Sequence, residues 1–143
     1  MAAVAFLARR DYACGELAAK LRERGFEPPV VSALLADLVA RRLLDDVRYA
    51  GHFVDYHRAR GQGPMRIRRD LEAFGVAAAL IEVALAAVAD WAGLAREVRR
   101  RRFGPEAPTD WAEKGRQARF LQYRGFSNDH VRSALGPDLE LDS

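Results

Sequence analysis

A ten-residue segment recurs three times in this chain, without gaps and at a constant spacing of 50 residues. The copies occupy residues 17–26, 67–76 and 117–126, and each copy has a glycine at its ninth position. A hydrophobic residue directly follows each glycine, and two more lie six and ten positions after it. A period of this length predicts a tandem array of small units rather than one compact globule.

The glycine of each copy is predicted to end a helix. Helices often finish with a residue in the left-handed conformation, which glycine adopts at little cost, and the next hydrophobic residue can pack back onto the last turn. A second helix is expected to start two or three residues later. Pro28 and Pro29 suit its first turn in the first copy, Ser127 is a good N-cap in the third, and Ala77 is a weaker start in the second. Each copy is therefore a helical hairpin.

The segments between the copies are expected to supply a third helix for each unit. Helices are predicted at residues 4–10, 45–59 and 91–103. The acidic pair Asp45 and Asp46 opens the second of these, and Pro64 takes the first helical position after a turn at 61–64. Thr109 is expected to cap the last long helix.

These features together predict an all-α fold, an elongated array of tandem three-helix repeats with about nine helices and no sheet. Alanine accounts for 26 of the 143 residues and favours helices over strands, and no run alternates with the period of a strand. The predicted parts are three-helix repeats at residues 1–44, 45–89 and 90–136 and an acidic flexible tail at 137–143. Such an array suits recognition of another extended object better than enclosure of a small substrate.

The charge is unevenly distributed along the chain. The formal net charge is +3, and because the tail carries three carboxylates, the preceding body carries +3 + 3 = +6. Residues 96–124 hold eight arginines and one lysine against four acidic residues. A basic stretch of this kind suits a phosphate backbone or an acidic protein partner, although solvated helix faces carry the same residues.

Arginine forks can grip phosphates or carboxylates through two parallel hydrogen bonds. The candidate DNA- or protein-binding residues are the cations that cluster on helices of the second and third units. They are Arg66, Arg68, Arg69, Arg99, Arg100, Arg101, Arg102, Lys114, Arg116, Arg119 and Arg124.

Aromatic residues allow two interpretations. Tyr49, Phe53 and Tyr56 lie at helical spacing beside arginines, so they could stack on the bases of a single strand. An aromatic stripe at this spacing is more often part of a core, which is the interpretation favoured here. Trp91 and Trp111 are likewise predicted to be buried anchors between the repeats.

The sequence contains no convergent set of catalytic groups. The single cysteine, Cys14, excludes a disulfide framework and is predicted to be a small buried residue, and His52, His57 and His130 are interpreted as structural or solvated. No metal-ligand spacing and no phosphate-binding loop is present. The sequence therefore predicts a protein that is not an enzyme and has no catalytic residues, no metal and no cofactor.

Membrane insertion and export are not predicted either. The longest nearly apolar stretch, residues 76–89, is 14 residues long and contains Glu82, whereas a membrane span needs roughly 20 residues. The apolar residues at the start precede Arg9 and Arg10, the reverse of a secretory signal. We therefore expect a cytoplasmic protein. Since no extended heptad seam is present, we also expect a monomer.

The ordered series of motifs resembles the RecX family of bacterial recombination regulators. The resemblance covers about residues 4–136, and its individual pieces occur in the family's order. They are Leu7-Ala8-Arg9-Arg10, Glu16-Leu17, Arg24-Gly25-Phe26, Leu43 to Ala50, Phe53-Val54, Gly61, Gly63-Pro64, Arg66-Ile67, Asp70-Leu71, Gly75-Val76, Arg119-Phe120-Leu121 and Arg124-Gly125-Phe126.

The resemblance implies an all-helical protein that binds along the groove of the RecA recombinase filament on single-stranded DNA. It further implies inhibition of ATP hydrolysis, strand exchange and co-protease activity, and direct DNA binding, with duplex DNA as a weaker ligand. The alternative is a duplex DNA-binding transcription regulator built on helix-turn-helix units, in which one helix reads base edges in the major groove. Threefold repetition and the lack of a dimerisation helix argue against that alternative.

Overall fold

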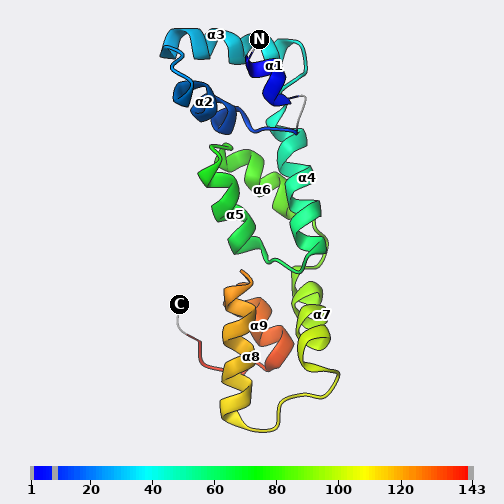
Figure 1. Cartoon of the computed structure of the whole chain (residues 1–143). Helices are drawn as coiled ribbons and strands as arrows, with labels where there is room; N and C mark the ends of the chain where they lie inside the picture. The colour runs from blue at the N-terminus through cyan, green and yellow to red at the C-terminus, as the bar shows by residue number, and fades with distance from the viewer. Residues whose placement is uncertain (1, 8–9, 142–143) are drawn as a thin grey trace.

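The computed structural model describes residues 2–7 and 10–141, and within this part it contains nine α-helices and no strand. The helices are α1 (Ala2–Leu7), α2 (Cys14–Glu23), α3 (Pro28–Ala40), α4 (Asp46–Ala59), α5 (Pro64–Ala73), α6 (Ala78–Ala86), α7 (Trp91–Phe103), α8 (Trp111–Tyr123) and α9 (Asn128–Leu135). They form three successive three-helix units stacked along one axis (Figure 1). The predicted elongated all-α array is confirmed.

Three backbone turns of the same kind end the middle helices α2, α5 and α8. Gly25, Gly75 and Gly125 have φ angles of 88°, 79° and 100°, in the left-handed region that favours glycine. In each unit the amide of the following residue donates to the carbonyl five residues earlier, as in Val76 N–H to the Leu71 oxygen at 3.1 Å. The helical hairpin predicted from the repeat is therefore confirmed in all three copies.

Helix starts agree with the sequence except at α8 and α1. The Asp45 and Ser127 side chains cap α4 and α9 as polar N-caps. The prediction that Thr109 caps α8 is wrong. The N-cap is Asp110, whose carboxylate accepts a hydrogen bond from the Glu113 backbone nitrogen at 2.7 Å. Helix α1 begins at Ala2, two residues before the predicted start, and is described as far as Leu7; residues 8 and 9 of the predicted helix lie outside the described part of the chain.

Each unit has a hydrophobic core of its own. Leu17, Leu21 and Leu38 are buried in the first, Ile67, Leu71 and Ile81 in the second, and Ala118, Leu121 and Val131 in the third. Two residues connect these cores. Ala13 of the first unit lies in the second core, and Trp91 packs against both the second and the third. Trp91 also donates its indole N–H to the Leu85 carbonyl at 3.1 Å, so its predicted role as an anchor between repeats is confirmed, although its side chain is half-buried rather than buried.

The joints between units are made by helix ends and turns. The start of a middle helix lies against the glycine turn of the next unit: α2 meets the turn after α5, and α5 meets the turn after α8 (Figure 1). At the second joint, Gly63 N–H donates to the Arg124 carbonyl at 2.8 Å and Met65 N–H donates to the Gly125 carbonyl at 2.9 Å. A Cβ added to Gly63 would lie 2.5 Å from the Gly125 carbonyl, so this approach requires a glycine.

Part of the segment predicted to be an acidic flexible tail is packed against the third unit. Leu139 is buried in the third core, and its carbonyl accepts a hydrogen bond from Arg132 Nε at 3.2 Å. Asp138 pairs with Lys114 at 3.2 Å. The acidic residues predict a solvated end, but Leu139, which lies between two of them, packs into the third core. Residues 142 and 143 lie outside the described part.

Among the aromatic residues, Tyr49 is buried and Phe53 is half-buried in the second core, which confirms the core interpretation for both. Tyr56 is instead exposed. The prediction that Trp111 is a buried anchor is wrong, because its side chain is 60% exposed at the start of α8. In the described residues, no single helix has the length and apolarity to cross a membrane; α6 and α7 reach that length only as a pair bent by 69°.

Candidate nucleic-acid interface

The eleven candidate cations lie on α5, α7 and α8, and at the residue that follows α8. Nearly half of them are held by carboxylates of the same chain. Arg68 pairs with Glu82 at 2.7 Å, and Lys114 pairs with Asp138. Exposed ion pairs of this kind contribute little to stability, yet they neutralise the charge that a phosphate would otherwise meet.

Two acidic residues hold the other paired cations. Glu97 pairs with both Arg100 and Arg101, at 2.7 and 2.9 Å. Glu113 pairs with Arg116 at 2.7 Å, and this hydrogen bond, with a second from Gln117, lowers the pKa of the Glu113 carboxyl to about 2. Two of the four arginines at 99–102 therefore share one carboxylate, whereas Arg116 at the start of α8 has a carboxylate of its own.

Arg99 has an internal position rather than a surface one. Its side chain is buried, and its guanidinium donates to Gln117 Oε1 at 3.0 Å and to the Gly104 carbonyl at 2.9 Å. A third hydrogen bond reaches the carbonyl of Glu106. Arg99 therefore holds the loop after α7 against α8. It is a structural residue, and we no longer count it among the surface contact residues.

Replacing Arg99 with methionine is expected to destabilise the protein by about 2–4 kcal/mol, because the buried Gln117 side chain and the loop carbonyls lose their donor. The measurement is urea unfolding followed by circular dichroism, with Arg100→Met, an exposed neighbour on α7, as the control. The affinity of the folded protein for single-stranded DNA should stay within about twofold, because a buried donor is not a phosphate ligand. Equal stability of the two variants would contradict the internal role.

Arg124 also serves the structure. Its Nε donates to the Gly61 carbonyl at 3.3 Å, and its Nη2 donates to the Arg60 carbonyl. Both carbonyls belong to the turn between α4 and α5 of the second unit, whereas Arg124 follows the last residue of α8 in the third. Arg124 therefore connects the third unit to the second across the second joint.

Six candidates have no ion pair within the described part of the chain, and two of them, Arg99 and Arg124, donate to neutral groups instead. The other four are Arg66, Arg69, Arg102 and Arg119. One of them lies against an exposed aromatic residue, and two more lie within one helical turn of that pair in sequence. The Arg66 guanidinium lies 5.9 Å from the centre of the Tyr123 ring. Arg119 lies one turn before Tyr123 on α8, and Arg69 lies one turn after Arg66 on α5. We call Arg66, Arg69, Arg119 and Tyr123 the joint stripe, because it crosses the second joint.

Sequence reasoning missed Tyr123, whose side chain is 77% exposed. A signal for it exists in the repeat: the equivalent positions are Glu23 and Ala73, so this position is not a core position and its aromatic ring is not needed for packing. An exposed ring flanked by unneutralised guanidinium groups can stack on a base while the cations meet the neighbouring phosphates.

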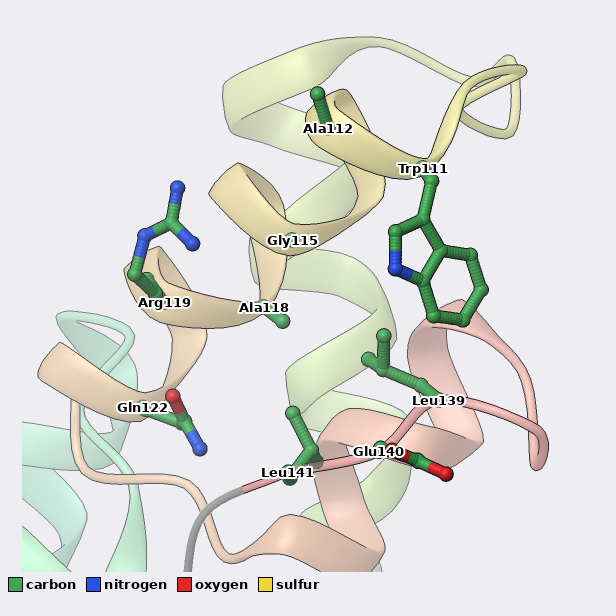
Figure 2. Close-up of a pocket in the computed structure, with 9 residues that line it drawn as sticks. All are labelled: Trp111, Ala112, Gly115, Ala118, Arg119, Gln122, Leu139, Glu140 and Leu141. Carbon is green, nitrogen blue, oxygen red and sulfur yellow. The ribbon is translucent and has the colours of Figure 1, made fainter.

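A pocket of about 590 Å³ lies beside the joint stripe, lined by residues of α5 and of the turn between α8 and α9. A second pocket, between α8 and the C-terminal segment, lies on another side of the helix. Figure 2 shows Trp111, Leu139 and Leu141 around that pocket, with the Arg119 side chain directed away from the leucines. Arg119 is exposed, and its guanidinium extends back along α8, where Nη1 lies 3.4 Å from a Cβ added at Gly115.

Burial shifts the pKa of three titratable groups elsewhere in the described residues. Burial, followed by the nearby Asp46 carboxylate, raises the pKa of Cys14 to about 11 and keeps the thiol protonated. Burial lowers the pKa of His57 and of His130. Residues 2–7 and 10–141 contain no group of three or more histidine, cysteine or acidic side chains placed to hold a metal ion.

The array of three-helix units and its basic joint define a class of helical-repeat binding proteins, and comparison with known proteins assigns the family. Models of the first, second and third three-helix domains of RecX match residues 1–38, 45–85 and 92–135. This chain belongs to the RecX family of regulatory proteins.

Relatives and solved structures agree with this assignment. The chain is 48% identical to the regulatory protein RecX of Halorhodospira halophila over 134 residues, 93% of this chain and 83% of that one. It is 40% identical to the regulatory protein RecX of Pseudomonas fluorescens, over 93% of this chain and 86% of the relative. The crystal structure of RecX from Lactobacillus salivarius shares the fold, with a TM-score of 0.80, 21% identity and coverage of 93% of this chain and 89% of that one.

Proposed function

We propose that this protein binds the RecA filament on single-stranded DNA and inhibits its ATPase, strand-exchange and co-protease activities. Membership of a family of regulatory proteins supports this function, and so does the elongated array, which can follow an extended partner. The chain acts by occupying a surface of the filament rather than by chemistry of its own.

The joint stripe is the observation that carries the proposal. Three guanidinium groups without ion pairs among the described residues, and one exposed ring, lie along α5 and α8, which follow each other end to end (Figure 1). This combination suits a single strand, whose bases are free to stack, better than a duplex, whose bases are already stacked.

The helix-turn-helix alternative requires a recognition helix with side chains that can reach base edges. The helices that follow the glycine turns in the first two units are α3 and α6, and neither contains an arginine or lysine. In the third unit, Arg132 of α9 is occupied by Asp129 and by the Leu139 carbonyl. The candidate recognition helices therefore offer no arginine or lysine without a partner for the bases of a major groove, and the filament function is favoured.

The test is a titration of the protein into preassembled RecA filaments on single-stranded DNA with ATP. We expect ATP hydrolysis to fall progressively, because a bound regulator stabilises or blocks one filament state. Repeating the titration with excess free single-stranded DNA separates inhibition of the filament from simple sequestration of DNA. Unchanged hydrolysis at stoichiometric protein, together with tight sequence-specific duplex binding, would sink the proposal.

A further inference from the structure

A second basic feature lies beside the joint stripe, in a pocket of about 380 Å³ between the end of α4, α7 and α8. Four arginines line it, and Val98 and Phe120 provide apolar walls. We call it the arginine pocket; its cations are Arg60, Arg101, Arg102 and Arg124. Arg60 comes from the second unit and the others from the third, so the pocket spans the second joint.

The charges of the arginine pocket are not balanced. Among the residues that the structure describes, no carboxylate lines it, and the nearest paired acid, Glu97, is shared between Arg101 and Arg100. The donors of Arg124 are occupied by backbone carbonyls. In the described part of the chain, Arg60 and Arg102 have no ion pair, so two cationic residues without a carboxylate partner line the same pocket. Bringing like charges together costs free energy that a bound anion recovers.

Aromatic rings hold these two arginines in place. The Arg60 guanidinium lies 4.6 Å from the centre of the Tyr56 ring, and that of Arg102 lies 5.5 Å from the centre of the Phe120 ring. A guanidinium over a ring face is fixed in orientation and keeps its N–H edge for a ligand. This also gives the exposed Tyr56 ring a role that core packing did not provide.

We propose that the arginine pocket holds a backbone phosphate of single-stranded nucleic acid, with Arg60 and Arg102 as its direct ligands. This inference rests on the proposed function and names the contact through which one strand is held. Arginine forks match phosphate oxygens through two parallel hydrogen bonds. A phosphate in this place would also tie the second unit to the third.

Continuity with the joint stripe favours a nucleic-acid backbone over a free anion. Phe120 and Arg124 of the pocket directly follow Arg119 and Tyr123 of the stripe along α8 and its end. Successive residues of a helix are about 100° apart around its axis, so the two features occupy adjoining faces. A strand with one base on Tyr123 can therefore place a neighbouring phosphate in the pocket.

The test is fluorescence anisotropy of a labelled oligothymidylate with the full chain, at several salt concentrations. The variant carries Arg60→Ala and Arg102→Ala, and the control carries Arg58→Ala and Arg96→Ala. Both control residues are exposed and paired with Asp55 and Asp90, and the control makes the same change of charge in the same region of α4 and α7. Circular dichroism melting confirms that both variants are folded.

We expect the affinity of the pocket variant to fall about tenfold, the effect of one charge-assisted hydrogen bond, and its salt slope to fall by about 0.7–1.4. The affinity of the control should fall less than about threefold, because its cations are already neutralised. The same reduction is expected for oligomers with and without a 5′-phosphate. A reduction confined to the 5′-phosphorylated oligomer, or equal reductions in variant and control, would overturn the assignment.

Inhibition of RecA ATPase by the unmodified chain separates the two proposals. If that inhibition occurs and the pocket variant keeps its DNA affinity and salt slope, the pocket assignment fails and the filament function stands. If the variant binds DNA more weakly as expected but the unmodified chain does not inhibit the ATPase, the pocket assignment stands and the filament function fails.

Discussion

Replacing Gly125 with alanine is expected to lower the free energy of unfolding by about 3 kcal/mol. The residue has a φ of 100°, where an alanine costs about 1–2 kcal/mol. The added Cβ would also meet the Cβ of Arg66 and lie 2.8 Å from its backbone nitrogen, and overpacking of this kind costs about 1–3 kcal/mol. Urea unfolding followed by circular dichroism measures the difference.

Gly25 provides a matched control. It occupies the same position of the repeat with a φ of 88°, but a Cβ added there would meet nothing within 4 Å. Gly25→Ala should therefore cost only about 1–2 kcal/mol, the strain of the left-handed conformation. If the two variants are destabilised equally, the strain alone explains the effect and the close approach at the joint contributes nothing.

Neutralising the joint stripe is expected to remove most of the affinity for single-stranded DNA. The variant replaces Arg66, Arg69 and Arg119 with glutamine. Removing one phosphate-binding cation lowers the slope of log affinity against log salt by about 0.7, so removing three changes it by about 2. Near physiological salt this corresponds to a weakening on the order of 50-fold. Anisotropy titrations between low and moderate salt give both quantities.

The control for this experiment neutralises three arginines that are already paired. Arg68, Arg100 and Arg116 lie on α5, α7 and α8 and contact Glu82, Glu97 and Glu113. Their replacement by glutamine changes the net charge by the same amount but removes no unpaired cation, so the slope should change by less than about 1. Equal effects of the two variants would mean that only net charge matters and that the joint stripe is ordinary surface.

Local signals made most of the fold predictable from the sequence. The repeated glycines adopt the left-handed backbone that ends a helix at little cost, and Pro64 and Ser127 mark helix starts through their own geometry and hydrogen bonding. These effects act within a few residues, so the pattern of one copy applies to the others. The prediction of Thr109 as a cap failed because the adjacent Asp110 is an equally good N-cap residue and takes that position.

The candidate site was less predictable because it depends on contacts between helices. In the run from Arg99 to Arg102, successive side chains point in directions about 100° apart, so the run cannot face one ligand together. Which member turns inward depends on Gln117 and the Gly104 loop, and which is neutralised depends on Glu97. Arg60 was not a candidate because only the folded joint brings it to the arginines of the third unit.

The joints have a mechanical consequence. Hydrophobic packing is concentrated inside the units, while Gly63 and Gly125 meet through backbone hydrogen bonds and close approach. Small changes of angle at such a seam disturb few side chains, whereas bending a unit would open its core. We therefore expect the molecule to behave as three stiff segments with two compliant couplings. A molecule built in this way can adjust its curvature to a helical filament whose pitch changes, and stay bound while the filament lengthens or shortens.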